Sequence, residues 1–467
     1  MSPKEPTTSA TPAPAPAATA TPPLNPAGCV SIKGMLPRTQ LAQLLMVGVD
    51  PSGPAEARLA VSRGVGGVFI GGEATGLLTD GALTQLNADT PLRVMVAVDE
   101  EGGRVQRIDG LDGSIPSARK MVQLGMTEAQ VHDLALTQGR AMGKYGVTVD
   151  FAPDADVSGQ PDRTVIGDRS FSADPAVVSR YAAAFARGLR DAGVLPVIKH
   201  FPGHGESSGD SHKGAVSVPP LSALKGRDLV PFRDLIASTP PDKLGVMIGH
   251  LDVPELTEPG TPASLSPAAI DLLRKGIGYS ASPFDGVVFS DDLAGMAAIT
   301  DKYDLPHAVL DTLKAGSDVA LFLTASRVPT VLDTLEQAVK NGELPTAQVQ
   351  NSVRRVLQAK NARDPRGAVA ASMPTAAQAA TIIGKIASAP HFTPNTSFPP
   401  SSESPATLIT SASRPATSTA SSPRGLRRRA QIHAAASAML ISTAMAILGV
   451  MTADHGSCRG GAESDAE

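Results

Sequence analysis

The sequence predicts an α/β fold, a (β/α)8 TIM barrel formed by a single domain with disordered N- and C-terminal tails. Short apolar runs rich in β-branched residues alternate with helical stretches, as expected for parallel strands joined by crossover helices. Most runs are continuously apolar, which is typical of strands covered on both faces. The eight runs are 44–49, 66–72, 93–99, 147–153, 195–201, 244–251, 286–292 and 318–323.

Helices are predicted in the longer connections, at 127–145, 175–192, 266–277 and 307–315, with two more within 328–362. Ionisable residues follow the apolar runs with a regularity that random surface placement would not produce. Because a barrel of this kind carries its functional side chains at the carboxyl ends of its strands, these residues are expected to share one face. They are Asp99, Lys199, His200, His250, Asp291 and Asp292.

The composition divides the chain into a barrel, 37–388, between a leader and a linker. The leader, 1–36, is rich in Pro, Ala and Thr, and the linker, 389–433, is rich in Ser, Thr, Pro and Ala. Neither segment has enough periodic apolar residues to offset its ordering entropy by burial, so both are expected to be disordered. A short tail, 454–467, ends the chain.

Segment 434–453 is uncharged and twenty residues long, enough to cross a bilayer once, so it is a candidate transmembrane helix. The preceding RGLRRR, 424–429, would place the barrel in the cytoplasm, since positive residues tend to stay inside. The leader instead resembles the stalk of an exported protein. We favour the cell envelope or a membrane-associated location and keep the cytoplasm as the alternative.

The formal net charge is −4 and no basic stripe crosses the barrel, so nucleic acid is not an expected partner. The two cysteines, Cys29 and Cys458, lie outside the predicted barrel. A disulfide framework and thiol catalysis are therefore excluded there. We expect a monomer that needs no cofactor and no metal.

Asp291 and Asp292 are candidates for a nucleophile. Both end an apolar strand, and side chains alternate in direction along a strand, so at most one points into the barrel mouth. The other interpretation is a helix N-cap, a position at which aspartate is common.

The segment KHFPGHGESSGDSH, 199–212, concentrates ionisable residues in a glycine-rich loop. Asp210 and His212 are two residues apart. In a turn, such a carboxylate can bond one imidazole nitrogen and leave the other facing a substrate, which suits a general acid/base. The alternative is a metal site, because His200, His204, Asp210 and His212 are ligand types suited to zinc. The His-x-His after the first strand of barrel-type metal hydrolases is missing, since that strand ends GVDPSG.

Arginines supply a further group of candidates. VDEEGGRVQR, 98–107, holds Arg104 and Arg107, and VIGDRSF, 165–171, holds Arg169. Guanidinium forks suit carboxylates and hydroxyl-rich ligands, although surface ion pairs would use the same residues.

Together these segments resemble the bacterial β-N-acetylhexosaminidases of glycoside hydrolase family 3, of the single-domain type. The resemblance runs from LAQLLMVGV to about Asn361, and KHFPGHG followed by DSH is its most specific part. VDEEGGRVQR, DFAPDADV, VIGDRSF, PASLS (262–266) and FSDDL occur in the family's order. Asp154 stands where the family usually has an apolar residue, which puts the packing there in doubt.

The resemblance implies a retaining hydrolysis of terminal, non-reducing β-linked N-acetylglucosamine, with peptidoglycan fragments (muropeptides) as the usual substrate and no metal. It implies Asp291 as the covalent nucleophile, His212 as the acid/base and Asp210 as its partner. The implied sugar-binding residues are Asp99, Arg107, Arg169, Lys199 and His200. Three alternatives remain: a non-catalytic envelope carbohydrate-binding protein, a metal-dependent TIM-barrel hydrolase, and a phosphorylase.

Overall fold

The computed structural model describes residue 32, residues 35–90 and residues 92–361. The predicted linker, transmembrane segment and tail at 389–433, 434–453 and 454–467 lie outside these ranges, as does most of the leader. No helix within the described ranges is both long and apolar enough to cross a membrane. Met35, which the sequence assigned to the leader, is buried against the barrel.

All eight predicted strands are present, and each begins and ends within or at the predicted run. They are β1 (Leu45–Val49), β2 (Gly67–Ile70), β3 (Met95–Val98), β4 (Val149–Asp150), β5 (Leu195–Phe201), β7 (Gly245–Ile248), β9 (Val287–Ser290) and β10 (Ala320–Phe322). They form one parallel sheet in the order β10-β1-β2-β3-β4-β5-β7-β9. A parallel bridge between Phe289 and Val319 joins the two outer strands, so the sheet is a nearly closed barrel. The short strands β6 (Val216–Ser217) and β8 (Leu251–Asp252) pair separately.

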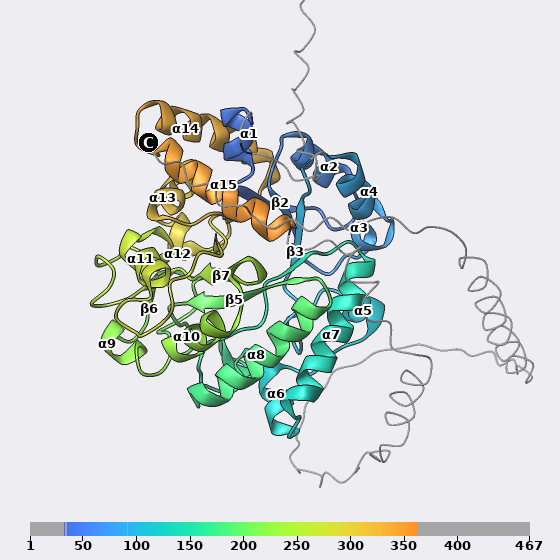
Figure 1. Ribbon diagram of the computed structural model, residues 1–467, viewed down its shortest axis with the longest axis vertical. Helices are drawn as coiled ribbons and strands as arrows, with labels where there is room; N and C mark the ends of the chain where they lie inside the picture. The colour runs from blue at the N-terminus through green and yellow to red at the C-terminus, as the bar shows by residue number, and fades with distance from the viewer. Residues whose placement is uncertain (1–31, 33–34, 91, 362–467) are drawn as a thin grey trace, which may run out of the picture. The chain divides into compact units, whose positions relative to one another are not determined.

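The helices form a layer around the strands (Figure 1). Those predicted in the sequence are α7 (Glu128–Lys144), α8 (Pro175–Asp191), α11 (Pro267–Lys275), α13 (Leu305–Ala315), α14 (Val328–Lys340) and α15 (Thr346–Asn361). The sequence did not predict the remaining helices, which are α1 (Pro37–Ala42), α2 (Ala55–Ser62), α3 (Gly76–Thr79), α4 (Ala82–Asp89), α5 (Asp109–Asp112), α6 (Ala118–Gln123), α9 (Leu221–Leu224), α10 (Leu229–Ser238) and α12 (Ala297–Thr300). The 3-10 turns are Gly167–Arg169, Pro241–Lys243, Ala263–Leu265 and Ala325–Arg327.

Helices α7 and α8 show how local sequence sets an element. α7 starts at a capping box in which Thr127 and Gln130 satisfy each other's backbone amides. α8 starts after the cap Asp174, with Pro175 in its first turn. The two helices can pack closely because residue 188 is a glycine. A Cβ there would lie 2.3 Å from the carbonyl oxygen of His132.

The barrel interior is filled by aromatic rings beneath the carboxyl ends of the strands. Phe69 stacks on Phe151 with ring centroids 5.7 Å apart, and Phe151 meets Phe289 edge-on at 5.5 Å. The rings come from three different strands or strand ends. The barrel interior is therefore a packed core rather than a pore.

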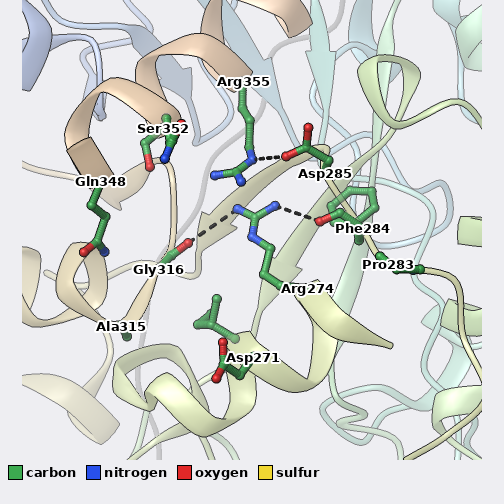
Figure 2. Close-up of a pocket in the computed structure, with 12 residues that line it drawn as sticks. Asp271, Arg274, Pro283, Phe284, Asp285, Ala315, Gly316, Gln348, Ser352 and Arg355 are labelled. Atoms are coloured by element: carbon green, nitrogen blue, oxygen red, sulfur yellow. Dashed lines mark hydrogen bonds and ion pairs between the residues drawn. The ribbon is translucent and has the colours of Figure 1, made fainter. Parts of the chain in front are cut away.

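Asp318 organises the opposite end of the barrel, just before β10. Its fully buried carboxylate accepts hydrogen bonds from Arg274 (2.5 Å), Arg355 (3.2 Å) and Ser352 (2.8 Å). A hollow of about 500 Å³ lies beside these arginines, as Figure 2 shows. Because the guanidinium groups are already bonded to the protein, and because this is the amino-terminal end of the strands, the hollow is not the expected functional site.

Replacing Asp318 by Asn should lower the free energy of unfolding by about 3 kcal/mol, because the largely buried guanidinium of Arg274 would lose its ion-pair partner and Arg355 would keep only the more exposed Asp285. The measurement is the urea midpoint at neutral pH. Asp271→Asn serves as the control, because its ion pair with Lys275 on α11 is exposed and should contribute less than about 1 kcal/mol. Equal effects of the two substitutions would contradict the assignment.

Candidate active site

A cavity of about 330 Å³ opens at the carboxyl ends of the strands. It lies at the mouth that the sequence predicted, above the aromatic interior. Of the predicted residues, Asp99, Arg107, Arg169, Lys199, His200, His212 and Asp291 line it, and Asp210 does not line it but pairs with His212. The strand ends therefore bring these residues together from distant parts of the sequence.

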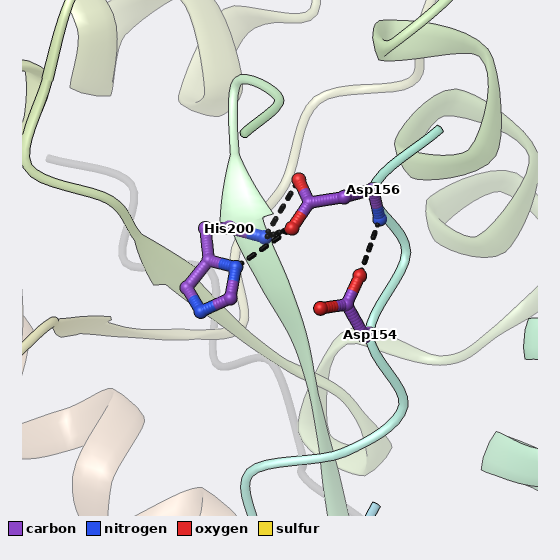
Figure 3. A group of neighbouring side chains, drawn as sticks. All are labelled: Asp154, Asp156 and His200. Carbon is purple, nitrogen blue, oxygen red and sulfur yellow. Dashed lines mark hydrogen bonds and ion pairs between the residues drawn. The ribbon is translucent and has the colours of Figure 1, made fainter. Parts of the chain in front are cut away.

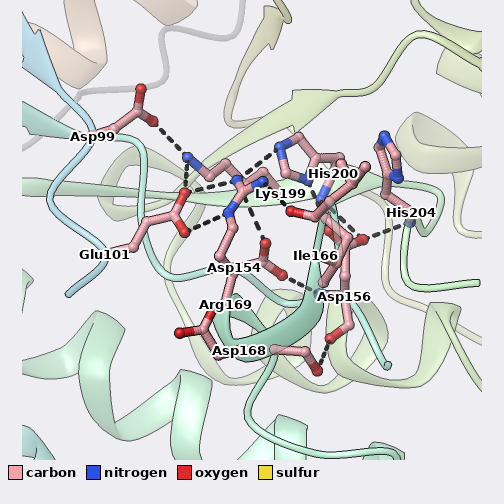
Figure 4. Close-up of polar contacts among 12 residues, drawn as sticks. Asp99, Glu101, Asp154, Asp156, Ile166, Asp168, Arg169, Lys199, His200 and His204 are labelled. Carbon is pink, nitrogen blue, oxygen red and sulfur yellow. Dashed lines mark hydrogen bonds and ion pairs between the residues drawn. The ribbon is translucent and has the colours of Figure 1, made fainter. Parts of the chain in front are cut away.

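Lys199 and Arg169 enclose a buried carboxylate, Glu101, at one wall of the cavity (Figure 4). The Lys199 ammonium lies 2.5 Å from both Glu101 and Asp99, and the Arg169 guanidinium forms a two-point contact with Glu101 at 2.8 Å. Burial alone would raise the pKa of Glu101, but the two cations hold that pKa far below its usual range. Burial would lower the pKa of Lys199, and the two carboxylates reverse this and raise it.

The paired charges at this wall leave Asp99 as the more exposed acceptor. The Asp99 side chain is 22% exposed, against 3% for Glu101. A hydroxyl-rich ligand would therefore meet Asp99 more readily than Glu101, which holds Lys199 and Arg169 in place.

His200 is held by Asp156, a residue that sequence reasoning missed (Figure 3). The Nδ1 of His200 donates to Asp156 Oδ2 at 2.7 Å, and the backbone amide of His204 donates to Asp156 Oδ1 at 2.6 Å. Burial would raise the pKa of Asp156, but His200 and these hydrogen bonds lower it to about 2. The ring of His200 is thus fixed, with Arg169 3.5 Å from its Nε2, and the residue lines the cavity.

Asp154, the acid whose effect on packing was in doubt, is buried beside Asp156 and Arg169. Its Oδ1 accepts the amide of Asp156 at 2.9 Å and its Oδ2 lies 3.6 Å from Arg169. Burial, reinforced by the negative charge of Asp156, raises the pKa of Asp154 well above its usual range. The barrel interior at this point is polar and holds two buried carboxyl groups, those of Asp154 and Asp156.

The predicted zinc ligands do not form one cluster in the described residues. Asp210 pairs with His212 on the loop, whereas His200 is bonded to Asp156. The group of possible ligands that does come together, Asp154, Asp156 and His200, is buried. Asp156 already accepts hydrogen bonds on both of its oxygens, so this arrangement suits a hydrogen-bond network better than a cation.

Asp291 and Asp292 have different roles in the structure. Asp292 accepts the amides of Ala294, Gly295 and Leu323 and so pins the turn after β9. Asp291 accepts only the amide of Asp292 among the hydrogen bonds to its carboxylate within the described residues. Both residues line the cavity, so the difference lies in their hydrogen bonds. The helix-cap interpretation fits neither residue, because the N-cap of the next helix, α12, is Met296. Asp292 holds the turn, and the carboxylate left for a ligand is that of Asp291.

Asp291 is kept ionised although it is 7% exposed. Burial would raise its pKa, but the fields of His250, His200 and Lys199 together with the amide of Asp292 lower it. His250 is bonded at both nitrogens, to Ser264 at 2.7 Å and to the carbonyl oxygen of Asp292 at 2.8 Å. It therefore holds the Asp292 backbone and faces the nucleophile candidate.

Asp210 and His212 form the local pair that their spacing predicted. The Nδ1 of His212 lies 2.9 Å from Asp210 Oδ1, and the His212 amide donates to the same oxygen at 3.0 Å. Because the carboxylate can only accept, the proton sits on Nδ1 and Nε2 stays free for a ligand. The His212 side chain is 63% exposed, at the rim of the cavity.

The two arginines of VDEEGGRVQR separate. Arg104 bonds Asp168 and the carbonyl oxygens of Thr164 and Val165, so it holds a loop rather than the cavity. Arg107 lines the cavity, and its buried Nε has no hydrogen-bond partner within the described part of the chain. Arg107 is therefore the arginine of this motif with a donor to offer.

The sequence profile of the "Glycosyl hydrolase family 3 N terminal domain" matches residues 37–359. The chain belongs to glycoside hydrolase family 3. It is thus a glycosidase, and the cavity at the strand ends is where the members of this fold place their chemistry.

Relatives within family 3 cover most of the barrel. The chain is 56% identical over 333 residues to beta-hexosaminidase LpqI of Mycobacterium tuberculosis, which covers 71% of this chain and 84% of that protein. A family 3 crystal structure from Mycobacterium smegmatis has 52% identity and a TM-score of 0.67, covering 70% of this chain and 98% of that one. A beta-N-acetylhexosaminidase from Beutenbergia cavernae has 27% identity and a TM-score of 0.61, covering 69% and 98%.

Asp228 lies under the start of the loop that carries Asp210 and His212. It is 1% exposed, and a Cβ on Gly203 would come within 2.4 Å of its Cβ. One carboxylate oxygen has no partner within the described residues, and the other lies 3.5 Å from Arg227. Burial, only partly offset by Arg227, raises the pKa of Asp228 to about 7.

Because the pKa of Asp228 is raised in the folded state, the free energy of unfolding should fall as the pH rises from about 4 to about 7. Above about pH 7 it should stay at this lower value. Asp228→Asn should remove the loss. The variant should then be at least about 1 kcal/mol more stable than the parent chain at pH 8 and equal to it near pH 4. Urea unfolding at both pH values measures this, and a difference that does not depend on pH would contradict it.

Proposed function

We propose that the chain is a retaining β-N-acetylhexosaminidase that removes terminal β-linked N-acetylglucosamine, with peptidoglycan fragments as the natural substrate. The proposal rests on one observation above all. An ionised carboxylate with open oxygens, Asp291, and an imidazole oriented by a carboxylate, His212, line the same cavity. Relatives that carry the name beta-hexosaminidase support the choice of sugar.

In the first step, Asp291 attacks the anomeric carbon while His212 gives its Nε2 proton to the glycosidic oxygen. The bond to the leaving group breaks and a glycosyl ester forms on Asp291. Asp210 stabilises the imidazolium form of His212 before transfer, because it accepts from Nδ1. Burial alone would raise the pKa of Asp210, but its hydrogen bonds with His212 lower it, so Asp210 stays charged.

In the second step, neutral His212 takes a proton from water, and the oxygen of that water attacks the anomeric carbon. The ester bond breaks and Asp291 is restored as a carboxylate. The charged wall of Asp99, Lys199 and Arg169, with His200 and Arg107, would bind the sugar hydroxyls and fix the ring for both steps. None of these steps draws on a metal ion.

Asp291→Asn should lower kcat by about 10⁴-fold or more, because the carboxamide is a poor nucleophile. In the parent chain, a slow substrate analogue in which fluorine replaces the 2-acetamido group of the sugar should label one peptide. Mass spectrometry should place the label on Asp291. Asp292→Asn is the matched control. It should weaken the turn and reduce activity, yet the label should remain on Asp291. A label on Asp292, or undiminished labelling of the Asp291→Asn variant, would end the proposal.

His212→Ala should make the rate depend on the leaving group. The value of kcat/KM should fall by about 10²-fold or more for a disaccharide of N-acetylglucosamine and 1,6-anhydro-N-acetylmuramic acid, whose departing alkoxide needs a proton. It should change little for the 2,4-dinitrophenyl glycoside, whose leaving group departs unaided. Failure of the parent chain to cleave the disaccharide would rule out the peptidoglycan substrate while leaving the mechanism open.

A further inference from the structure

Ser211, which lies between Asp210 and His212, is buried while its neighbours are not. It is 3% exposed, whereas the side chains of His212 and Lys213 are 63% and 82% exposed. A buried polar residue at the tip of an otherwise exposed loop is unusual, because its polar atoms need partners.

The partners of Ser211 belong to the segment that follows the nucleophile strand. Its carbonyl oxygen accepts the amide of Ala298 at 3.0 Å, and its hydroxyl donates to the sulfur of Met296 at 3.5 Å. Among the described residues, two hydrogen bonds join residues 209–214 to α12 or to its N-cap. Both of them involve Ser211. The tip of the loop is therefore attached at this residue.

The segment that receives Ser211 is itself firmly placed. Asp292 accepts the amide of Gly295, and a Cβ there would lie 2.4 Å from the Asp292 carboxylate. Met296 comes next, as the N-cap of α12, and is 8% exposed. A short, tightly turned stretch thus separates Asp291 from the point where the loop is attached.

We propose that Ser211, through Met296 and Ala298, is a positioning residue that sets the imidazole of His212 relative to the carboxylate of Asp291. This inference rests on the acid/base role proposed for His212. Acid and nucleophile act on two atoms of one glycosidic bond, so their separation must be held to a fraction of an ångström. Attaching the loop to the nucleophile's own segment fixes that separation whatever the rest of the loop does.

The expected effect of Ser211→Ala is selective. The value of kcat/KM for the disaccharide should fall by about tenfold, since a misplaced acid protonates the leaving oxygen poorly. For the 2,4-dinitrophenyl glycoside it should stay within about twofold. If Ser211 instead bound the sugar, both substrates would lose equally through KM.

A double-mutant cycle tests the route through the sulfur. Met296→Leu keeps the side-chain volume and removes the acceptor, and should show the same leaving-group dependence as Ser211→Ala. The two changes together should cost no more than one of them, because both break one contact. Hydrogen exchange at the Ala298 amide should be faster in Ser211→Ala, because the loop tip is released.

Ser207→Ala is the matched control. Its hydroxyl bonds the carbonyl oxygen of Gly209, within the loop, so its loss leaves the attachment to Met296 intact. This variant should keep the parent ratio of the two kcat/KM values. A ratio in Ser211→Ala equal to that in Ser207→Ala would overturn the inference. If His212→Ala itself shows no dependence on the leaving group, the proposed acid/base role fails, and the positioning role fails with it.

Discussion

Glu101 buried between Lys199 and Arg169 is the interaction on which the mouth of the barrel depends. Removing three charges from water is costly, and the cost is met only when the contacts are short and complete. Both cations contact Glu101 at 2.8 Å or less. The strands β3 and β5 and the turn at Arg169 are thereby tied to one carboxylate, and the wall that faces the ligand cannot shift without exposing a charge.

The same demand for complete pairing separates the two ends of the barrel. At the amino-terminal end, Arg274 and Arg355 already donate hydrogen bonds to Asp318 and to other protein groups. The larger hollow there therefore has few free polar groups to bind a sugar. At the carboxyl end, Asp291 and the Nε2 of His212 are left with capacity to act. Function follows from the groups that the fold leaves incompletely paired.

The candidate site combines a buried and an exposed group. Asp291 is buried, with its charge maintained by the histidines around it, as a nucleophile requires. His212 is mostly exposed on a loop, which suits the proton transfer to substrate and from water that we propose for it. Ser211 joins the two, so that the exposed loop inherits its position from the buried strand end.

The sequence by itself determined the strand ranges, the polar strand ends and the Asp210–His212 pair, because each depends on residues close together in the chain. Strand alternation did not decide between Asp291 and Asp292, since it leaves the direction of each side chain open, and only the resemblance to family 3 favoured Asp291. Sequence reasoning also missed the pairing of Glu101 with Arg169, which lies 68 residues away. Only the closed barrel decides such contacts, because they depend on the register of neighbouring strands and on which loops the closure brings to the same mouth.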